Sequence, residues 1–540
     1  MNAPVAQTAI VKPRDTFDRL TFLGWTWGLL AIVAGLAASF LLFGYFVIYW
    51  RNADMDFMVI YSALAMNGGK PQHFLDHTAY LTIIAVKSWF HLLHDLGLLD
   101  AWTLPAIPPA ADTTAFDAAM TQAVRAARVL AFLIATGSVV IFAGLSRLIL
   151  RDWRVAMLAT LAFALSGGVA VHLRILRSEL VAAIPVIFAL MILIAAGRRA
   201  TPARPLALAL AAFLCVLGLE NKVQAILLIG VLPVAILPFG SAAGASVGFW
   251  RNTPTAWLVS LLATAAAIAA VFAAWPLIAT GFDRALLDTA HFKPLLGRYG
   301  LYQAGLLVLI GVCMIAYAAL WRVSAAETIA SIAAVALGTA TALFVLDLDY
   351  NAGNVIAVFN PLEKMLTFAD TNTSSAAGGS NPLAIMWLLF DGVLSVLARD
   401  TFVLHSSARP TVFLTWLIAP GIVIAWRRGE TLAALQATAL MLAALAIETL
   451  EVRRGLKSEY FIFTDPLIIL SAAILLDCLR DLRFHRFAYP IAATLFALHI
   501  AVGQAEPVKY AFKRTGPQSI CEWSGYYAPL LPLPWCFTSR

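Results

Sequence analysis

Charged residues are scarce in this 540-residue chain: Asp, Glu, Lys and Arg make up 12% of it, whereas apolar residues make up 61%. A soluble globular domain carries about 25% charged and about 45–50% apolar residues. So little charge leaves too little polar surface to face water, which excludes a soluble enzyme and a disordered scaffold. The net charge of +7 is also small for a nucleic-acid binder. The composition therefore predicts a polytopic membrane protein.

Cysteine is rare as well, with five residues in the whole chain. Cys215, Cys313 and Cys478 lie in apolar runs, where a thiol behaves as a small hydrophobic side chain. Cys521 and Cys536 lie in the polar, aromatic C-terminal segment, where they can form a disulfide if that segment is periplasmic or extracellular. No pair of cysteines has the spacing of a zinc site, and we expect no metal and no other cofactor.

What the sequence has in abundance is apolar runs long enough to cross a bilayer, which takes about 20 helical residues. Thirteen such runs lie at 21–49, 128–150, 154–172, 180–197, 205–219, 223–240, 256–280, 302–321, 328–346, 411–426, 431–449, 461–479 and 487–504. The first run has no small-residue cleavage site near its end, so we interpret it as an uncleaved span. We predict an all-α protein with about thirteen transmembrane helices.

The distribution of basic residues predicts the orientation of these helices. If the N-terminus is inside, every second junction is cytoplasmic and is expected to be rich in Lys and Arg. These junctions are short and contain Arg147/Arg151/Arg154, Arg198/Arg199/Arg204, Arg251, Arg322, Arg427/Arg428 and Arg480/Arg483/Arg486. The pattern predicts that the N-terminus lies inside and the C-terminus outside.

Two loops on the opposite side are long, which is typical of functional loops. Residues 50–127 form the first and include the amphipathic stretch from Tyr80 to Leu99, and residues 347–410 form the fifth. An apolar run at 382–397 is short for a span, so we expect it to lie in the interface plane. The chain then divides into a cytoplasmic tail (1–20), a transmembrane core with the first loop (21–346), the loop 347–410, C-terminal helices (411–504) and a periplasmic tail (505–540).

Ionisable residues at the mouth of a membrane bundle are candidates for a functional site. On the outer side they come from segments that are far apart in the sequence. They include Asp54, Asp56, His73, Asp76, His77, Arg125, Arg128, Arg174, Arg177, Glu179, Glu220, Lys222, Asp347, Asp349, Arg453, Arg454 and Lys457. Carboxylates and cations are thus expected to gather at one membrane face.

The order of several short motifs resembles the C-type glycosyltransferase superfamily, whose polytopic enzymes use polyprenyl-phosphate sugar donors. The resemblance covers the N-terminal half best and lies closest to protein O-mannosyltransferases, lipid A aminoarabinose transferases and polyprenol-dependent mannosyltransferases. It rests on Asp56-Phe57, Tyr61 and Gly68-Gly69, on the stretch His73 to His77, on Arg128, and on Asn221-Lys222. The Pro-Pro that usually follows the His73–His77 element is absent, and Asn221 replaces a Thr.

This resemblance implies an inverting transfer at the periplasmic face of a bacterial inner membrane. A loop aspartate accepts the proton of the acceptor hydroxyl as a general base, and this is Asp56 or Asp54. Cations balance the phosphate of the leaving lipid, and these are Lys222, Arg174, Arg177 and Arg128. Tyr61, His73, Asp76, His77 and Glu179 then line the substrate site. The partners are the lipid-linked donor, a lipid or glycan acceptor and membrane lipids, with no nucleic acid.

Simpler explanations exist for the same residues. The two aspartates can solvate a loop, the cations can reach lipid head groups, and Glu179 can pair with Arg177 or Lys222 as structure alone. Arg174 and Arg177 lie one helical turn apart and can hold a phosphate jointly. Asp347 and Asp349 have oxygen ligands suited to a divalent cation, but a solvated loop start explains them more simply.

Two other classes of protein compete with the transferase hypothesis. A transporter or flippase of lipid-linked glycans places its ionisable residues near the bilayer midplane on broken helices, whereas here the candidates lie at helix ends. A ligase or polymerase of lipid-linked glycans shares the basic outer face. It predicts essential arginines and no indispensable aspartate in the first loop.

Overall fold

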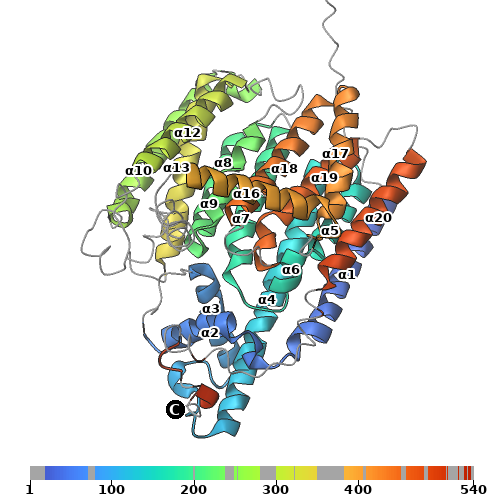
Figure 1. The fold of residues 1–540 in the computed structure, drawn as a ribbon. Coiled ribbons are helices and arrows are strands. Elements are labelled where there is room, and N and C mark those ends of the chain that lie inside the picture. Colours follow the sequence, from blue (N-terminus) through green and yellow to red (C-terminus); the bar gives the residue numbers. More distant parts are fainter. Residues whose placement is uncertain are drawn as a thin grey trace, which may run out of the picture.

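The computed structural model describes residues 19–70, 79–198, 201–236, 248–251, 253–279, 300–320, 323–348, 382–405, 409–451, 458–478, 485–505, 508, 521, 528–531 and 533–536. Within these residues the chain forms helices and no strand. Figure 1 shows most of them side by side in one bundle, with a smaller group of helices at one end. The protein is thus an all-helical membrane protein.

The first half of the bundle follows the predicted runs. It contains α1 (Arg19–Phe40) with the π-helical turn η1 (Leu41–Tyr45), α4 (Thr113–Ile149), α5 (Trp153–Ala164), α6 (Gly167–His172), α7 (Ser178–Gly197), α8 (Arg204–Asn221), α9 (Ala225–Ile229) and η4 (Leu232–Ile236). The second half contains α10 (Pro254–Ala279), α12 (Gly300–Leu320), α13 (Ala325–Asp347), α17 (Val412–Arg427), α18 (Thr431–Glu451), η10 (Ser458–Phe463), α19 (Asp465–Cys478) and α20 (His485–Gly503).

Each of the thirteen predicted runs falls on one of these helices or on a pair of short ones. Among the described residues, seven helices are long and apolar enough to cross a bilayer: α1 with η1, α4, α7, α8, α10, α13 and α18. The run at 154–172 is broken, because α5 ends before Ser166 and this serine caps α6 by accepting a hydrogen bond from the N–H of Val169 at 3.3 Å.

The first loop is built around the protruding end of α4. This helix has 37 residues and is therefore about 55 Å long, while a hydrocarbon core is about 30 Å thick. Its excess length carries Phe116, Met120 and Val124, which pack with α2 (Ala53–Asn67) and α3 (Tyr80–Asp95) in a separate hydrophobic core. The helix predicted from the amphipathic stretch Tyr80 to Leu99 is thus α3. Figure 1 shows this group below the main bundle.

The run at 382–397 forms part of α16 (Pro382–Thr401). Figure 1 shows α16 lying across the bundle, in front of α17 and α18, which contact it. Its exposed described residues include the apolar Phe390 and Leu394 and the charged Asp391. That α16 lies along the membrane surface stays a prediction.

At the end of the bundle opposite the first loop, the basic junctions are tied to other helices. The Asp477 carboxylate accepts hydrogen bonds from the N–H groups of Arg151 and Asp152, at 2.9 and 2.8 Å. Arg198 donates to the side chain of Gln436 at 2.9 Å, and Arg204 pairs with Glu327 at 3.2 Å. The described residues of these junctions are therefore bonded to α13, α18 and α19.

Candidate functional site

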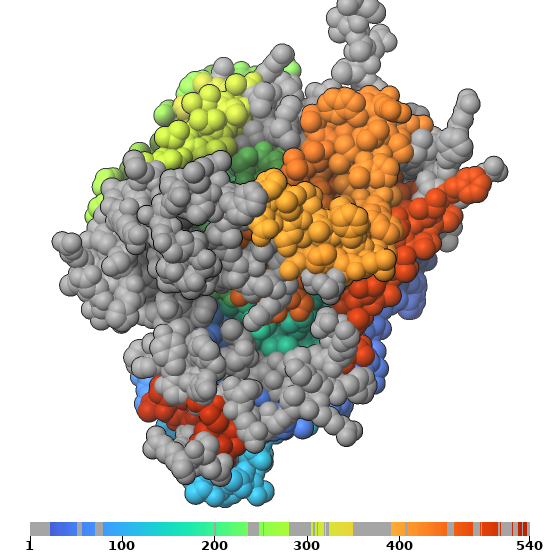
Figure 2. Space-filling view, viewed as in Figure 1, coloured from blue at the N-terminus to red at the C-terminus, as the bar shows by residue number. Residues whose placement is uncertain are grey.

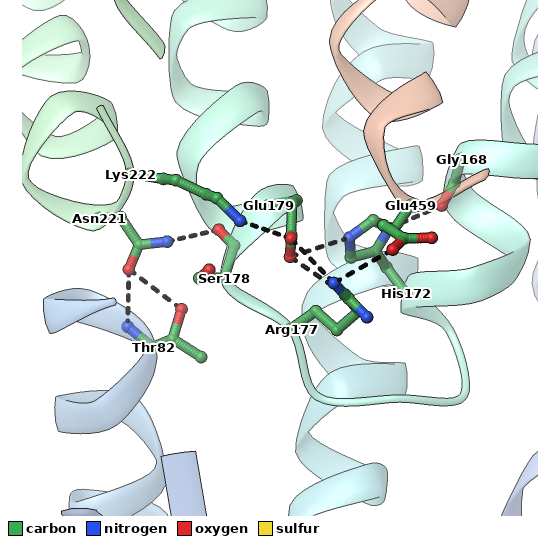
Figure 3. A network of polar contacts seen from close by, with 9 residues as sticks. All are labelled: Thr82, Gly168, His172, Arg177, Ser178, Glu179, Asn221, Lys222 and Glu459. Atoms are coloured by element: carbon green, nitrogen blue, oxygen red, sulfur yellow. Dashed lines mark hydrogen bonds and ion pairs between the residues drawn. The ribbon is translucent and has the colours of Figure 1, made fainter. Parts of the chain in front are cut away.

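The start of α7 and the end of α8 meet at a buried carboxylate. Glu179 lies in the first turn of α7 and is completely buried. Its Oε1 is 2.5 Å from Nζ of Lys222, which follows α8, and 3.1 Å from Nη2 of Arg177 (Figure 3). One carboxylate thus faces two cations, and we call Arg177, Glu179 and Lys222 the lysine cluster.

Close packing of the two helices brings Lys222 to Glu179. A Cβ atom at Gly218 in α8 would lie 2.7 Å from the carbonyl oxygen of Ala182 in α7, a distance that real Cβ contacts do not reach. The absence of a side chain at Gly218 therefore permits the contact between the two helices. The sequence expectation that Glu179 pairs with Arg177 or Lys222 is confirmed, because it pairs with both.

Two other elements reach the lysine cluster. Nε2 of His172, at the end of α6, lies 3.9 Å from Oε2 of Glu179, and Glu459 in η10 is 3.4 Å from Arg177. The ammonium group of Lys222 also lies 5.2 Å from the ring centre of Tyr460, at a distance suited to a cation–π contact. Arg177 is the most exposed of the three cluster residues, with 11% of its side chain accessible.

The first loop is attached next to this cluster through Asn221. Its Oδ1 accepts hydrogen bonds from the N–H and hydroxyl of Thr82 at 3.1 and 3.0 Å, and its Nδ2 donates to the carbonyl of Ser178. The N–H of Ala79 donates to the Asn221 carbonyl at 3.0 Å. Asn221 therefore joins α3, α7 and α8 at the level of Lys222 (Figure 3).

The candidate residues of the first loop are only partly described. Asp54 and Asp56 lie at the start of α2, although their side chains are outside the description, and His73, Asp76 and His77 lie outside the described residues. Tyr61 follows in the same helix, is buried, and shares a hydrogen bond with the backbone of Leu530. Burial raises the pKa of the Tyr61 hydroxyl, which therefore stays protonated at neutral pH.

Arg128 and Arg174 do not converge with Lys222. Arg128 donates to the carbonyl oxygens of Val47 and Ile48, after the end of η1. Arg174 donates to the hydroxyl of Ser39 and to the carbonyl of Ala170. Their contacts hold the outer end of α1 to α4 and to the segment after α6.

The positions of Arg174 and Arg177 differ from the prediction that the two share one helical face. They lie in the connection between α6 and α7 and not on one helical face, so their guanidinium groups have different partners. The break after α5 leaves α6 only six residues long, and the chain is extended at Arg177. Joint binding of one phosphate by this pair therefore has no support in their arrangement.

A second buried cluster was not found from the sequence. Arg409, before α17, lies 2.8 Å from Asp465 at the start of α19, and it contacts Glu448 near the end of α18. Asp400, near the end of α16, faces the same arginine and accepts a hydrogen bond from the hydroxyl of Thr411 at 3.2 Å. We call Asp400, Arg409, Glu448 and Asp465 the arginine cluster; all four are buried.

The signal for this cluster was present in the sequence. Glu448 and Asp465 lie inside the predicted runs 431–449 and 461–479, and an ionisable residue inside a span is a functional or structural signal in itself. Glu448 and Asp465 were missed because the candidate residues were taken from loops and helix ends. Arg409 lies before the run at 411–426, at a position that resembles any other residue bordering a span.

Gly168 in α6 connects the two clusters. Its N–H donates to Oδ2 of Asp465 at 3.2 Å, and its carbonyl lies 2.7 Å from Nδ1 of His172, which faces Glu179. A Cβ atom at this position would lie 2.6 Å from the backbone nitrogen of Ile462 in η10. The close approach of α6 to η10 therefore depends on glycine.

The described residues contain no group of three His, Cys, Asp or Glu side chains that could hold a metal ion. Asp347 ends α13, and Asp349 lies outside the described part of the chain. The described charged groups next to the first loop are the cations Arg177 and Lys222 with the carboxylates Glu179 and Glu459. Comparisons with protein-family models, with curated proteins and with solved structures gave no match.

Proposed function

We propose that this protein is a membrane glycosyltransferase of the C-type superfamily that moves a sugar from a polyprenyl phosphate to an acceptor in the outer leaflet. The observation that carries the proposal is the lysine cluster, buried at the outer ends of α7 and α8 directly beside the attachment point of the first loop. Together with the sequence motifs, it supplies cations at the membrane face where a lipid phosphate lies.

The cluster suits a phosphate whose charge grows as its bond to the sugar breaks. Glu179 fixes Arg177 and Lys222 in place before a donor arrives, so little reorganisation is needed during the reaction. Both cations share Glu179 and Glu459 also pairs with Arg177, so the cations balance the carboxylates, and burial strengthens the attraction of the cations for an anion. Arg177 is the more accessible cation, and we assign it the first contact with the phosphate.

The acceptor side of the reaction is assigned to the first turn of α2. A carboxylate of Asp56 or Asp54 takes the proton of the acceptor hydroxyl while that oxygen attacks the anomeric carbon. The lipid phosphate leaves with the bonding electron pair. Because the acceptor oxygen displaces it directly, the configuration at the anomeric carbon is inverted. Because α2 packs on α3, and α3 bonds to Asn221, the helix that carries the base belongs to the same unit as the cations.

We also propose thirteen transmembrane helices with the N-terminus inside, and contacts between distant segments support this count. Thr82 and Asn221 are in contact, and four predicted spans lie between them in the sequence. Arg177 and Glu459 are also in contact, with eight predicted spans between them. Both numbers are even, as they must be for residues on one side of a membrane. A crossing by α16 would make the second number odd.

The C-terminal segment supports the same topology and location. Twelve predicted spans separate Tyr61 from the C-terminal segment, and the packing of Ala528, Leu531 and Leu533 in the core of the first loop supports a tail on the same side as that loop. Cys521 and Cys536 form a disulfide, as the sequence left open. Disulfides persist in oxidising compartments, and we therefore propose the bacterial inner membrane with the site facing the periplasm.

Single substitutions in the purified protein test the proposal. Asp→Asn at the base should lower turnover by about 10²–10⁴-fold and leave binding of a sugar-free polyprenyl phosphate unchanged. Lys222→Ala should weaken that binding about tenfold or more, since a charge-assisted hydrogen bond contributes about 1.5–3 kcal/mol. The exposed residues Asp100 and Lys70 provide matched controls. Full turnover in both Asp54→Asn and Asp56→Asn would contradict the mechanism.

One observation favours a second candidate, a flippase of lipid-linked glycans. The break between α5 and α6 lies beside the charged groups, and transporters build their sites on such discontinuous helices. Reconstituted liposomes separate the two functions. A flippase moves a labelled lipid-linked glycan between leaflets and leaves it intact, whereas the proposed transferase releases polyprenyl phosphate. A ligase or polymerase would instead lose activity in arginine variants and keep it in both aspartate variants.

A further inference from the structure

The end of the chain lies in the hydrophobic core of the first loop. Ala528, Leu531 and Leu533 are buried against residues of α2, α3 and the protruding part of α4. Figure 2 shows the red C-terminal residues lying on the blue atoms of this loop. More than 400 residues separate these segments in sequence, so no local preference brings them together.

The tail touches α2 at two positions one helical turn apart. The ring centre of Trp535 lies 6.5 Å from that of Phe57, and also 6.0 Å from that of Tyr49. The backbone of Leu530 shares a hydrogen bond with the hydroxyl of Tyr61. Phe57 directly follows Asp56, so the tail contacts the turn of α2 that carries the candidate base.

The same aromatic group is fixed from the other side by α4. The hydroxyl of Tyr49 donates a hydrogen bond to Asp117, and its ring stacks on Phe57 with centroids 6.0 Å apart. The disulfide between Cys521 and Cys536 closes the tail immediately next to Trp535, in the short helix η12 (Pro534–Cys536). Trp535 is therefore restrained by a covalent link at the neighbouring residue.

We propose that Trp535, restrained by the Cys521–Cys536 disulfide, is a positioning residue that fixes the first turn of α2 and with it the general base. This inference rests on the proposed function for its catalytic consequence. A base must lie about 2.6–3.2 Å from the proton it removes, and a misplacement of about 1 Å costs about 10²-fold in rate. The tail acts on this geometry through Phe57 and Tyr61.

The test combines amide hydrogen exchange with kinetics on the full-length protein in detergent. In Trp535→Ala, amides of residues 53–61 should exchange at least tenfold faster than in the parent protein, while those of α7 and α8 stay unchanged. Trp535→Phe should restore slow exchange, because it keeps an aromatic ring against Phe57. The control is Leu530→Ala, since the Leu530 side chain is exposed and only its backbone contacts Tyr61.

The kinetic arm uses polyprenyl-phosphate sugars extracted from bacterial membranes as the donor and follows the release of polyprenyl phosphate. Trp535→Ala should lower kcat about 10²-fold with KM for the donor unchanged, and Trp535→Phe should recover most of the rate. If Trp535→Ala fails to accumulate, the double variant Cys521→Ser/Cys536→Ser provides the same comparison, with an expected loss in the same direction.

The outcomes separate this inference from the proposed function. Slow exchange in α2 of Trp535→Ala, or of the double serine variant, would overturn the positioning role whatever the reaction is. A parallel fall of kcat and rise of KM, without recovery in Trp535→Phe, would also overturn it and indicate general loss of structure. If the parent protein releases no polyprenyl phosphate while α2 loosens as expected, the positioning of α2 stands and the proposed function fails.

Discussion

The lysine cluster and the arginine cluster differ in charge balance. In the lysine cluster the cations Arg177 and Lys222 face Glu179, and Glu459 also pairs with Arg177, so cations and carboxylates are equal in number. In the arginine cluster one buried cation faces the carboxylates of Glu448 and Asp465, with a third carboxylate, Asp400, close by. Both lie in the bundle and both touch η10, so the difference is one of charge and not of depth or packing.

This difference indicates separate tasks. An anion such as a lipid phosphate can bind where cations balance the carboxylates and one cation, Arg177, is partly exposed, whereas a surplus of buried negative charge repels it. The arginine cluster instead joins the connection between α16 and α17 to α18, α19 and α6, through Arg409, Glu448 and Asp465. The guanidinium of Arg409 also lies 4.0 Å from the ring centre of Phe461. We interpret the arginine cluster as structural and the lysine cluster as the anion site.

The largest expected effect comes from removing the central cation of the arginine cluster. Arg409→Met leaves Asp465 and Glu448 buried without their counter-ion, which should destabilise the fold by about 3–5 kcal/mol. Lys222→Met should cost less, because Arg177 still pairs with Glu179. Unfolding midpoints in detergent measure both, with Arg427→Met as an exposed control. A larger loss in Lys222→Met would reverse the assignment of the two clusters.

A smaller effect is expected at Gly168, which connects the clusters. In Gly168→Ala the new methyl group meets the backbone of Ile462, and overpacking of this kind costs about 1–3 kcal/mol. Both clusters should loosen together, because Gly168 bonds to Asp465 and to His172. The control is Gly137→Ala in α4, where a Cβ would meet nothing within 4 Å. Equal stability of the two variants would show that the clusters are independent.

The smallest effect is a dependence of stability on pH. Burial, and secondarily the charge of Asp465, raise the pKa of Asp400 above 3.8, against the opposing effects of Arg409 and Thr411. The protonated Asp400 carboxyl therefore contributes its full stabilisation of the fold below pH about 4. As the pH rises through the raised pKa, this contribution is lost, and the free energy of unfolding falls by at most about 1.4 kcal/mol per pH unit. Asp400→Asn should remove this slope, and Asp391→Asn, at an exposed site of α16, should keep it. If stability depends on pH in the same way in Asp400→Asn, a group other than Asp400 causes the pH dependence.

The sequence predicted the helices well and their interruptions less well. Apolar runs become helices because a bilayer leaves no other way to satisfy the backbone of a single spanning segment. The break between α5 and α6 has a local signal, since Ser166 is a good N-cap residue and Gly168 follows it. That signal was hidden inside an otherwise continuous apolar run, and the run at 154–172 was therefore interpreted as one helix.

The candidate site was predicted in part. Glu179, Arg177 and Lys222 were identified because they lie at helix ends on one face. Their pairing depends on the approach of α7 and α8 at Gly218. Asn221 was noted only as the replacement for a Thr, and its role in attaching α3 became visible in the fold. The roles of Asp54 and Asp56 remain predictions from the sequence.

By itself the sequence determined the class of protein and the positions of its apolar helices, because hydropathy acts on each segment separately. Only the tertiary structure decided which charges meet. Arg409 with Glu448 and Asp465, Lys222 with Glu179, and Trp535 with Phe57 are each brought together by the packing of different helices. The physical reason is that burial makes a charge depend on its partner, and no local pattern specifies a partner on another helix.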